Sequence, residues 1–316
     1  MKLIQPSFEI LDQEPGIKGV YKAIEYPGRI CYGSTDKITE DSAEEFVHKL
    51  EKANHGAPME HGAVYLHITR NVDYDEWLSP SPEYSKYDEL LKFYSDNQYS
   101  KVEERVCVGL KDHLYISTNY RVLFENDRLD DLKYLCEPTK FHHKRVTVKF
   151  TCNIGVSREY NRHRKDSINE ESTRYCNYSK DKYGNEINVI VNNNKFNGRL
   201  DELEKKNRAE DIRSYCLQIV QGKDDSFSDI DYWLFSQMAA EFSYIGLTTK
   251  CDWKAQDARD VLPINTKSIL VHSAFIDDWR HFFDLRAIGT TGAPHPQAKE
   301  LAMPLMEEFK NRKLID

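Results

Sequence analysis

The chain has 316 residues, with 44 lysines and arginines against 52 aspartates and glutamates and a net charge of −8. This balance disfavours a protein that coats nucleic acid, unless a local basic patch acts alone. Seven scattered cysteines without a CxxC pair indicate neither a disulfide framework nor a zinc knuckle, and they favour a reducing, cytoplasmic location. No apolar run approaches the roughly 20 residues that cross a bilayer, so we expect a soluble protein without a membrane partner.

The N-terminal part opens with short apolar runs broken by turn residues. Over residues 1–35 several glycines and a Pro-Gly pair interrupt the apolar positions, so the sequence predicts short strands and turns there. A capping-box pattern followed by helical spacing predicts a helix over 43–54, and alternation predicts a strand over 63–68. His61 lies just before that strand, where spacing alone favours a capping or hydrogen-bonding histidine over a catalytic one.

Residues 70–145 form a polar, tyrosine-rich excursion from this pattern. Its periodicity predicts a helix over 87–94 and a strand over 114–117. Two short helices are predicted after the strand, one from Asn119 and one over 129–135. Cys136, His142 and His143 are the residues here that could suggest a metal. Adjacent histidines point in different directions on a strand and the cysteine is six positions away, so no metal site is predicted.

A cleanly alternating strand, predicted over 146–152, leads into the most charged stretch of the chain, residues 158–180. The residues expected on one face of this strand are Val146, Val148, Phe150 and Cys152. Gly155 allows a bend between the strand and the charged stretch. We therefore expect the strand to be an anchor and the charged stretch to be its functional edge.

The remainder of the chain is mainly helical in pattern. The polar, charge-rich composition of residues 180–213 predicts a loop followed by an exposed helix. We do not expect functional residues in this stretch. Further helices are predicted over 229–245, 255–261, 277–286 and 296–311. The first of these is expected to end at Gly246 and to bury a stripe that includes Phe242. Trp279, Phe282 and Phe283 are expected as buried anchors.

Residues 158–180 carry the strongest chemical signal in the chain. Basic residues and hydroxyls are interleaved over a short distance: Arg158, Arg162, His163, Arg164, Ser167, Ser172 and Arg174. A charge run of this kind is most often a solvated helix face. Two arginines flanking a histidine, followed by hydroxyls and a further arginine, instead suit a doubly anionic ligand.

The order Arg162-His163-Arg164, seven residues and then Ser172 resembles the signature of the flavin-dependent thymidylate synthases, the ThyX family. Further segments resemble family segments in the same order: RICYGS at 29–34, MEHGAVYLHI at 59–68, STRYCNYSKDKYG from Ser172, ARDVLP at 258–263, WRHFFDLR at 279–286 and HPQ at 295–297. The resemblance covers most of the chain. It identifies residues 70–145 as the insertion of the larger members, within a single catalytic domain over 1–316.

The resemblance implies an enzyme and an assembly. The implied reaction is the reductive methylation of dUMP to dTMP, with methylenetetrahydrofolate as carbon donor, NADPH as reductant and FAD as electron carrier. The implied fold is α+β, a mostly antiparallel sheet flanked by helices. The implied assembly is a homotetramer with active sites between subunits, and no nucleic acid partner is expected.

The resemblance also assigns roles to individual residues. FAD is expected to contact Arg162, His163, Arg164, His61 and His281. The residues expected at dUMP are Glu159, Glu170, Ser172, Arg174, Arg259 and Arg286. Arg286 and His61 are the catalytic candidates, because a cation at Arg286 would stabilise negative charge on the pyrimidine. Ser172 is assigned to binding, since no Asp/His triad order accompanies it.

Two positions depart from the family pattern. Phe275 and Asp277 stand where the family usually has Asn and Arg, at positions that contact FAD in relatives, and an acid near a dinucleotide phosphate should weaken FAD. A cation from the insertion could take the missing role. These departures leave open a relative with altered chemistry, such as hydroxymethylation of dUMP. A non-catalytic protein that binds nucleotide or RNA is the second alternative, although the net charge speaks against it.

Overall fold

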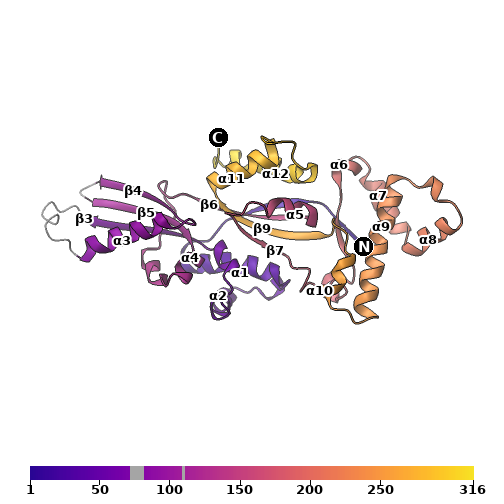
Figure 1. The fold of residues 1–316 in the computed structure, drawn as a ribbon, viewed down its shortest axis with the longest axis horizontal. Helices are drawn as coiled ribbons and strands as arrows, with labels where there is room; N and C mark the ends of the chain where they lie inside the picture. Colours follow the sequence, from indigo (N-terminus) through magenta and orange to yellow (C-terminus); the bar gives the residue numbers. More distant parts are fainter. Residues whose placement is uncertain (72–81, 109–110) are drawn as a thin grey trace.

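The computed structural model describes residues 1–71, 82–108 and 111–316, so positions 72–81 and 109–110 of the predicted insertion lie outside the described residues. The molecule is elongated, with a central sheet, a smaller sheet at one end and a group of helices at the other (Figure 1). None of the described helices is long and apolar enough to cross a membrane.

The strands and helices follow one another along the chain with few long connections. The strands are β1 Lys2–Ile4, β2 Ser7–Leu11, β3 Ala63–Asn71, β4 Lys101–Val108, β5 Lys111–Asn119, β6 Arg145–Asn153, β7 Ser167–Glu170, β8 Asn188–Ile190 and β9 Lys267–Phe275. The α-helices are α1 Gly16–Cys31, α2 Ser42–Lys52, α3 Pro82–Asp96, α4 Tyr120–Glu125, α5 Ile154–Tyr160, α6 Asn193–Phe196, α7 Leu200–Ala209, α8 Ile212–Val220, α9 Asp229–Thr249, α10 Ala255–Ala258, α11 Ile276–Phe283 and α12 Pro296–Asn311. Short helical turns include η2 Ala57–His61, η4 Leu129–Tyr134, η7 Arg259–Val261 and the π-helical η8 Asp284–Ile288.

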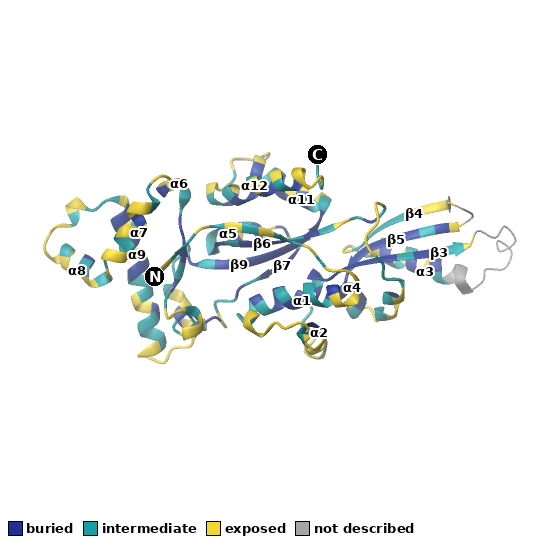
Figure 2. Ribbon diagram, turned by 180° about the vertical axis from the view of Figure 1, so that it is seen from behind, coloured by how far each residue is buried: buried dark blue, intermediate teal, exposed yellow. Residues whose placement is uncertain are grey.

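The central sheet is antiparallel throughout and has the order β2-β6-β9-β7. The predicted strand over 146–152 is confirmed as β6, and its predicted face is buried. That face packs against α5, α11 and α12, and Figure 2 shows the central strands mostly buried. The expected combination of helices with a mainly antiparallel sheet is therefore confirmed, apart from the short parallel pair β1-β8.

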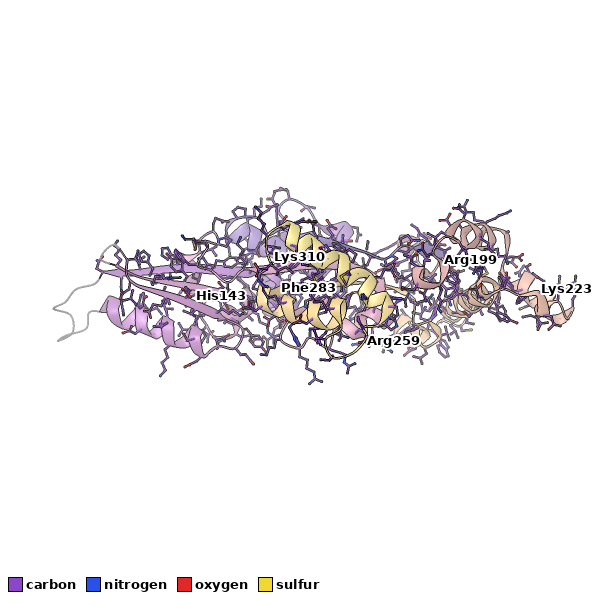
Figure 3. All side chains as sticks on the ribbon, turned by 90° about the horizontal axis from the view of Figure 1, so that it is seen from above. His143, Arg199, Lys223, Arg259, Phe283 and Lys310 are labelled. Carbon is purple, nitrogen blue, oxygen red and sulfur yellow. The ribbon has the colours of Figure 1, made fainter. Side chains whose placement is uncertain are left out.

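The C-terminal helices α11 and α12 pack on the buried face of the central sheet. Trp279 is fully buried and donates from Nε1 to the carbonyl oxygen of Val146 over 3.1 Å. Phe282 and Phe283 pack around it, as predicted, and Figure 3 labels Phe283 within the pair α11 and α12. The helices predicted over 277–286 and 296–311 are confirmed in position, although the first changes to a π-helical turn at Asp284.

The prediction of strands and turns over residues 1–35 is wrong in its second half, where α1 forms. Gly19 and Gly28, which suggested turns, instead lie inside this helix at positions where a larger side chain would clash with a neighbour. A Cβ on Gly19 would lie 1.7 Å from the carbonyl oxygen of Glu14, and one on Gly28 would lie 2.7 Å from the ring of Phe46. Gly28 lets α1 pack closely against α2 and η2 beneath the central sheet, whereas Gly19 makes room for the backbone just before the helix.

In the described residues, β4 and β5 of the insertion form a three-stranded antiparallel sheet with β3, which begins before the insertion, in the order β3-β5-β4. One face of this sheet packs against α3 through residues such as Leu114 and Leu90. The helix, strand and two short helices predicted in this part are confirmed as α3, β5, α4 and η4. Asn119 accepts a hydrogen bond from the backbone N–H of Val122 and so caps α4.

The helices α6–α9 form the other end of the molecule, and Figure 2 shows many exposed residues there. The predicted end of the long helix at Gly246 is wrong, since α9 continues to Thr249. The hydroxyl of Thr248 donates to the carbonyl oxygen of Tyr244 over 2.9 Å within this last turn. Phe242 is 61% exposed, contrary to the prediction, because the buried face turns toward Tyr244 and its contact with Tyr178.

Candidate active site

The basic motif lies in the connection between β6 and β7. The side chain of Asn153 accepts from the backbone N–H of Val156 over 2.7 Å and caps α5, so the bend expected at Gly155 is the first turn of a helix. This helix carries Glu159, and the loop after it carries the Arg162-His163-Arg164 motif. The motif is thus held between the end of α5 and the start of β7, the strand at one edge of the central sheet.

A cleft of about 1060 Å³ opens beside this loop. Its lining consists of Glu159, Arg162, His163, Arg164, Lys165, Asp166, Asp278, His281, Leu285, Arg286 and residues 291–295. Five of the predicted FAD and dUMP residues therefore share one cavity with Arg286: Glu159 on α5, the three motif residues Arg162, His163 and Arg164, and His281 on α11. The π-helical turn η8 presents Arg286 to the motif, and such turns recur at functional sites.

Arg286 is held between a histidine and a carboxylate. Its Nε donates to Nε2 of His163 over 3.2 Å, and its Nη1 donates to Oε2 of Glu159 over 2.7 Å. The guanidinium is only 12% exposed. Because Nε2 of His163 accepts this bond, the proton of the neutral ring is assigned to Nδ1.

His163 is kept neutral by its surroundings. Burial, followed by the positive charge that His272 can carry, lowers its pKa to about 4, and Arg286 acts in the same direction. The ring of His281 lies 5.8 Å away, edge to face. At neutral pH the cleft therefore offers an uncharged imidazole beside a fixed guanidinium.

A buried pair that the sequence did not predict supports the loop from behind. His272 on β9 is fully buried, and its Nε2 donates to Oδ2 of Asp166 over 2.6 Å. The backbone N–H of Asp166 in turn donates to the carbonyl oxygen of His163 over 3.1 Å. The ring of His272 packs on Trp279 at 4.4 Å between centroids. Asp166 is therefore a positioning residue for the motif.

The charges of the cleft favour an anion. Its acids are largely satisfied within the protein: Glu159 pairs with Arg286 and Asp166 with His272. Burial and the neighbouring Asp166 raise the pKa of Asp278. Over the described ranges, by contrast, Arg164 and Lys165 form no ion pair and are exposed at the cleft. These two cations can serve a ligand at no loss of internal pairing.

A second hollow, of about 450 Å³, lies on the other side of the motif loop. It shares His163, Arg164 and Asp166 with the cleft and adds Glu170 at the end of β7. Oε1 of Glu170 accepts from Ser268 over 2.8 Å, and Oε2 accepts from Asn161 over 3.1 Å. The predicted nucleotide residue Glu170 is thus close to the motif but outside the main cleft.

Ser172, Arg174 and Arg259 form a separate group beyond β7. Ser172 Oγ accepts from the backbone N–H of Arg174 over 3.3 Å. Nη1 of Arg259, from the turn after α10, reaches the hydroxyl of Thr173 over 3.5 Å, and Figure 3 places Arg259 where the central body meets the helical end. Both arginines are exposed. The structure thus brings the three predicted phosphate contacts together, apart from the cleft residues.

His61 lies on the opposite face of the central sheet. It is 1% exposed, and its Nδ1 is hydrogen-bonded to Oγ of Ser273 over 2.7 Å. Burial, followed by the charge of Arg145, lowers its pKa to about 3. Its Nε2 has no partner among the described residues. His61 lines neither hollow, so one protomer does not join it to the other predicted residues.

The two departures from the family pattern meet a lysine of the insertion. Nζ of Lys101, at the start of β4, lies 2.6 Å from Oδ2 of Asp277 and 4.9 Å above the ring of Phe275. This bond lowers the pKa of the Asp277 carboxyl. The insertion therefore supplies a cation next to Asp278, a residue of the cleft wall.

Solved structures give a low level of similarity. One is the structure of PolB, a UMP/dUMP methylase from Streptomyces cacaoi, bound with 5-Br dUMP. It is 15% identical in sequence to this chain and has a TM-score of 0.36, and the match covers 99% of this chain and 92% of that chain. Its form with 5-Br UMP is 14% identical, with a TM-score of 0.39 over 98% and 91%. Thymidylate Synthase X from Helicobacter pylori, with FAD and dUMP, is 12% identical, with a TM-score of 0.35 over 96% and 92%.

The family comparison is decisive where the structural one is weak. No curated protein matches the chain. The family described as thymidylate synthase complementing protein matches residues 126–312, which is more than half of the chain and includes all of the basic motif, α11 and α12. The chain therefore belongs to the family of thymidylate synthase complementing proteins, the ThyX family.

Proposed function

We propose that the protein is a flavin-dependent thymidylate synthase that converts dUMP to dTMP, with methylenetetrahydrofolate as carbon donor and NADPH as reductant. The observation that carries this proposal is the contact of Arg286 with neutral His163 and with Glu159 inside a cleft rimmed by further cations. All three residues lie within the family match. A fixed cation beside a neutral imidazole suits a reaction in which negative charge develops on a bound ring.

The cleft fits FAD by its donor set. Arg162, Arg164 and Lys165 offer cations for a diphosphate or an anionic ring, and His163 and His281 offer imidazoles. FAD, when bound, supplies two-electron transfer between NADPH and the one-carbon unit. The residues that we assign to hold it are Arg162, His163, Arg164 and His281, with Lys165 added from the structure.

The group formed by Ser172, Arg174 and Arg259 suits the phosphate of dUMP. A phosphate is recognised by charge-assisted hydrogen bonds from guanidinium groups and by neutral hydroxyl donors. Arg174 and Arg259 are exposed, and neither forms an ion pair within the described residues, so both remain available to a ligand. Arg286 and Glu159 would then contact the pyrimidine, with Arg286 stabilising its negative charge.

We also infer a homotetramer with active sites between subunits. The support is the separation of the predicted residues within one protomer. They lie in three places: the cleft around His163, the residue group around Arg174 that we assign to the dUMP phosphate, and the buried position of His61. A site shared between chains would unite residues that one chain keeps apart. Size-exclusion chromatography with light scattering measures this state directly.

The experiment that tests the function is product analysis with the purified protein. Reconstitution with FAD, followed by dUMP, methylenetetrahydrofolate and NADPH, should give dTMP and oxidise NADPH in equal amounts. Formation of hydroxymethyl-dUMP would identify the altered chemistry instead. Failure to bind FAD, with no product from dUMP, would refute the assignment.

A further inference from the structure

Tyr99, a residue of the insertion, lines the second hollow beside the motif. It is the aromatic side chain in a lining that otherwise includes His163, Arg164 and Glu170. Tyr99 is 45% exposed, so its ring is accessible to a ligand in this hollow. An exposed ring next to an imidazole, a guanidinium and carboxylates has the composition of a site for a flat, polar ring.

The turn that carries Tyr99 is held rigidly. The side-chain oxygen of Asn97 accepts from the backbone N–H of Tyr99 over 3.0 Å and from the hydroxyl of Ser100 over 3.1 Å. The Ser100 oxygen is also hydrogen-bonded to the hydroxyl of Thr118 on β5 over 2.8 Å, where the Thr118 hydroxyl can donate. A pinned turn loses little conformational freedom when a ligand binds to its side chain.

The same turn is tied to the main cleft. Lys101, two residues further on, contacts Asp277, whose neighbour Asp278 belongs to the cleft wall. The hollow and the cleft also share His163, Arg164 and Asp166. A ring placed on Tyr99 would therefore lie next to the groups that surround Arg286.

The polar groups of the hollow favour a ring with N–H edges. Glu60 from η2 is ion-paired with Arg121, and Glu170 from β7 accepts from Ser268 and Asn161. Each carboxylate oxygen has a further lone pair, which can accept a hydrogen bond from a ring N–H or amino group. Arg164 brings donors for ring carbonyl groups. Tyr99 adds a broad aromatic face to the smaller apolar contribution of Ala57 and Ile168.

We propose that Tyr99 is the stacking platform for a planar heteroaromatic ring in the second hollow, so that the insertion completes the ligand site. This inference rests on the proposed function, which supplies three ring sources: the flavin, the pyrimidine of dUMP and the pterin of the folate. Their shared chemistry is a flat ring edged with N–H and carbonyl groups. Tyr99 is a binding residue in this scheme and takes no part in proton transfer.

The test compares ligand affinities in single variants of the full chain. Dissociation constants for FAD, and for dUMP and 5-formyltetrahydrofolate with the FAD-loaded protein, are measured in the wild type, Tyr99→Leu, Tyr99→Gln and Tyr99→Phe. Stacking on an aromatic side chain corresponds to a change of about tenfold in affinity. Both non-aromatic variants should weaken the same ligand by about tenfold, and Tyr99→Phe should stay within about twofold.

Tyr232→Leu on α9 is the matched control, since Tyr232 is 57% exposed and lines neither hollow. The ligand that responds to the Tyr99 variants identifies the ring. Unchanged affinity for all three ligands in Tyr99→Leu and Tyr99→Gln would overturn the inference and leave the proposed function standing. A wild type that binds none of the three would overturn both.

Discussion

Arg286 donates from Nε to Nε2 of His163 over 3.2 Å, across 123 positions of the sequence. This bond defines the protonation of the site, because a protonated His163 would bring a second N–H and a like charge against the guanidinium. Its other anchor, Glu159, balances the charge of Arg286 without neutralising His163. A neutral acceptor and a fixed cation are thus joined in one hydrogen-bonded unit.

Replacing Arg286 should abolish the cation without emptying the cleft. We expect Arg286→Gln to lower kcat for dTMP formation by about 100-fold, the effect typical of losing one charge-stabilising donor. The loss of the nearby charge should also raise the pKa of His163 from about 4, which NMR titration of the ring would record. Arg280→Gln, an exposed position on α11, serves as the control. An Arg286→Gln variant with normal kcat would contradict the role.

Removing Arg174 should separate nucleotide affinity from flavin affinity. Charge-assisted bonds to phosphate contribute about 1.5–3 kcal/mol each, so Arg174→Ala should weaken dUMP by about tenfold or more while FAD stays bound. Isothermal titration with dUMP and the flavin absorbance measure the two effects. Arg213→Ala, an exposed arginine on α8, should change neither. Loss of FAD with intact dUMP affinity would reverse the assignment of the two subsites.

The pair of Lys101 and Asp277 makes a sharp double-mutant test of the insertion. Lys101→Met leaves the carboxylate of Asp277 without its cation near the cleft wall, so FAD affinity should fall by a few fold. Asp277→Asn added to Lys101→Met should restore that affinity, since the uncompensated charge is removed. Unfolding free energy should change by less than about 1 kcal/mol, because the pair is partly exposed. Failure of the second substitution to restore FAD affinity would show that charge is not the cause.

Stability should fall in mild acid because of two buried histidines. Burial lowers the folded pKa of His61 to about 3 and that of His163 to about 4, against an ordinary pKa of 6.5 for an exposed imidazole. The unfolded chain therefore binds protons first, and the stability of the neutral rings is fully present above pH 6.5 and lost as the pH falls from there toward the folded values. Between pH 6.5 and 5 each ring should lower the free energy of unfolding by about 1.6 kcal/mol.

Urea unfolding at a series of pH values measures this dependence. As the pH falls from 6.5 to 5, the free energy of unfolding should fall less steeply in His61→Asn than in the wild type. The difference in slope should correspond to about one proton, since asparagine does not titrate. An unchanged slope would mean that His61 is charged in the folded protein.

Local patterns were enough to predict several elements. Strand β6 was predicted because its apolar residues alternate, and α12 because Pro296 begins a stripe that ends near Asn311. Helix α1 was missed because Gly19 and Gly28 are typical of turns in sequence, whereas their reason is contact with Glu14 and Phe46 in space. Packing demands of this kind cannot be read from a single segment.

The same limit applies to the candidate site. The motif itself was found from residue types within a short stretch, and so were its basic neighbours. The contact of Asp166 with His272 spans 106 positions, and that of Lys101 with Asp277 spans 176. Tyr99 gave no signal at all, since one tyrosine among many in the insertion has no distinguishing spacing. Only the tertiary fold makes these residues neighbours of the cleft.

Strand β9 has a consequence for how the site assembles during folding. His272 faces Asp166 on one side of the sheet, and the next residue, Ser273, faces His61 on the other. A slip of one position would turn both side chains to the wrong face at once. Two adjacent residues of β9 therefore make contacts on opposite faces of the sheet that both require the native strand register. A misaligned chain would lose the contact of His272 with Asp166, which supports the motif loop, and also the contact of Ser273 with His61.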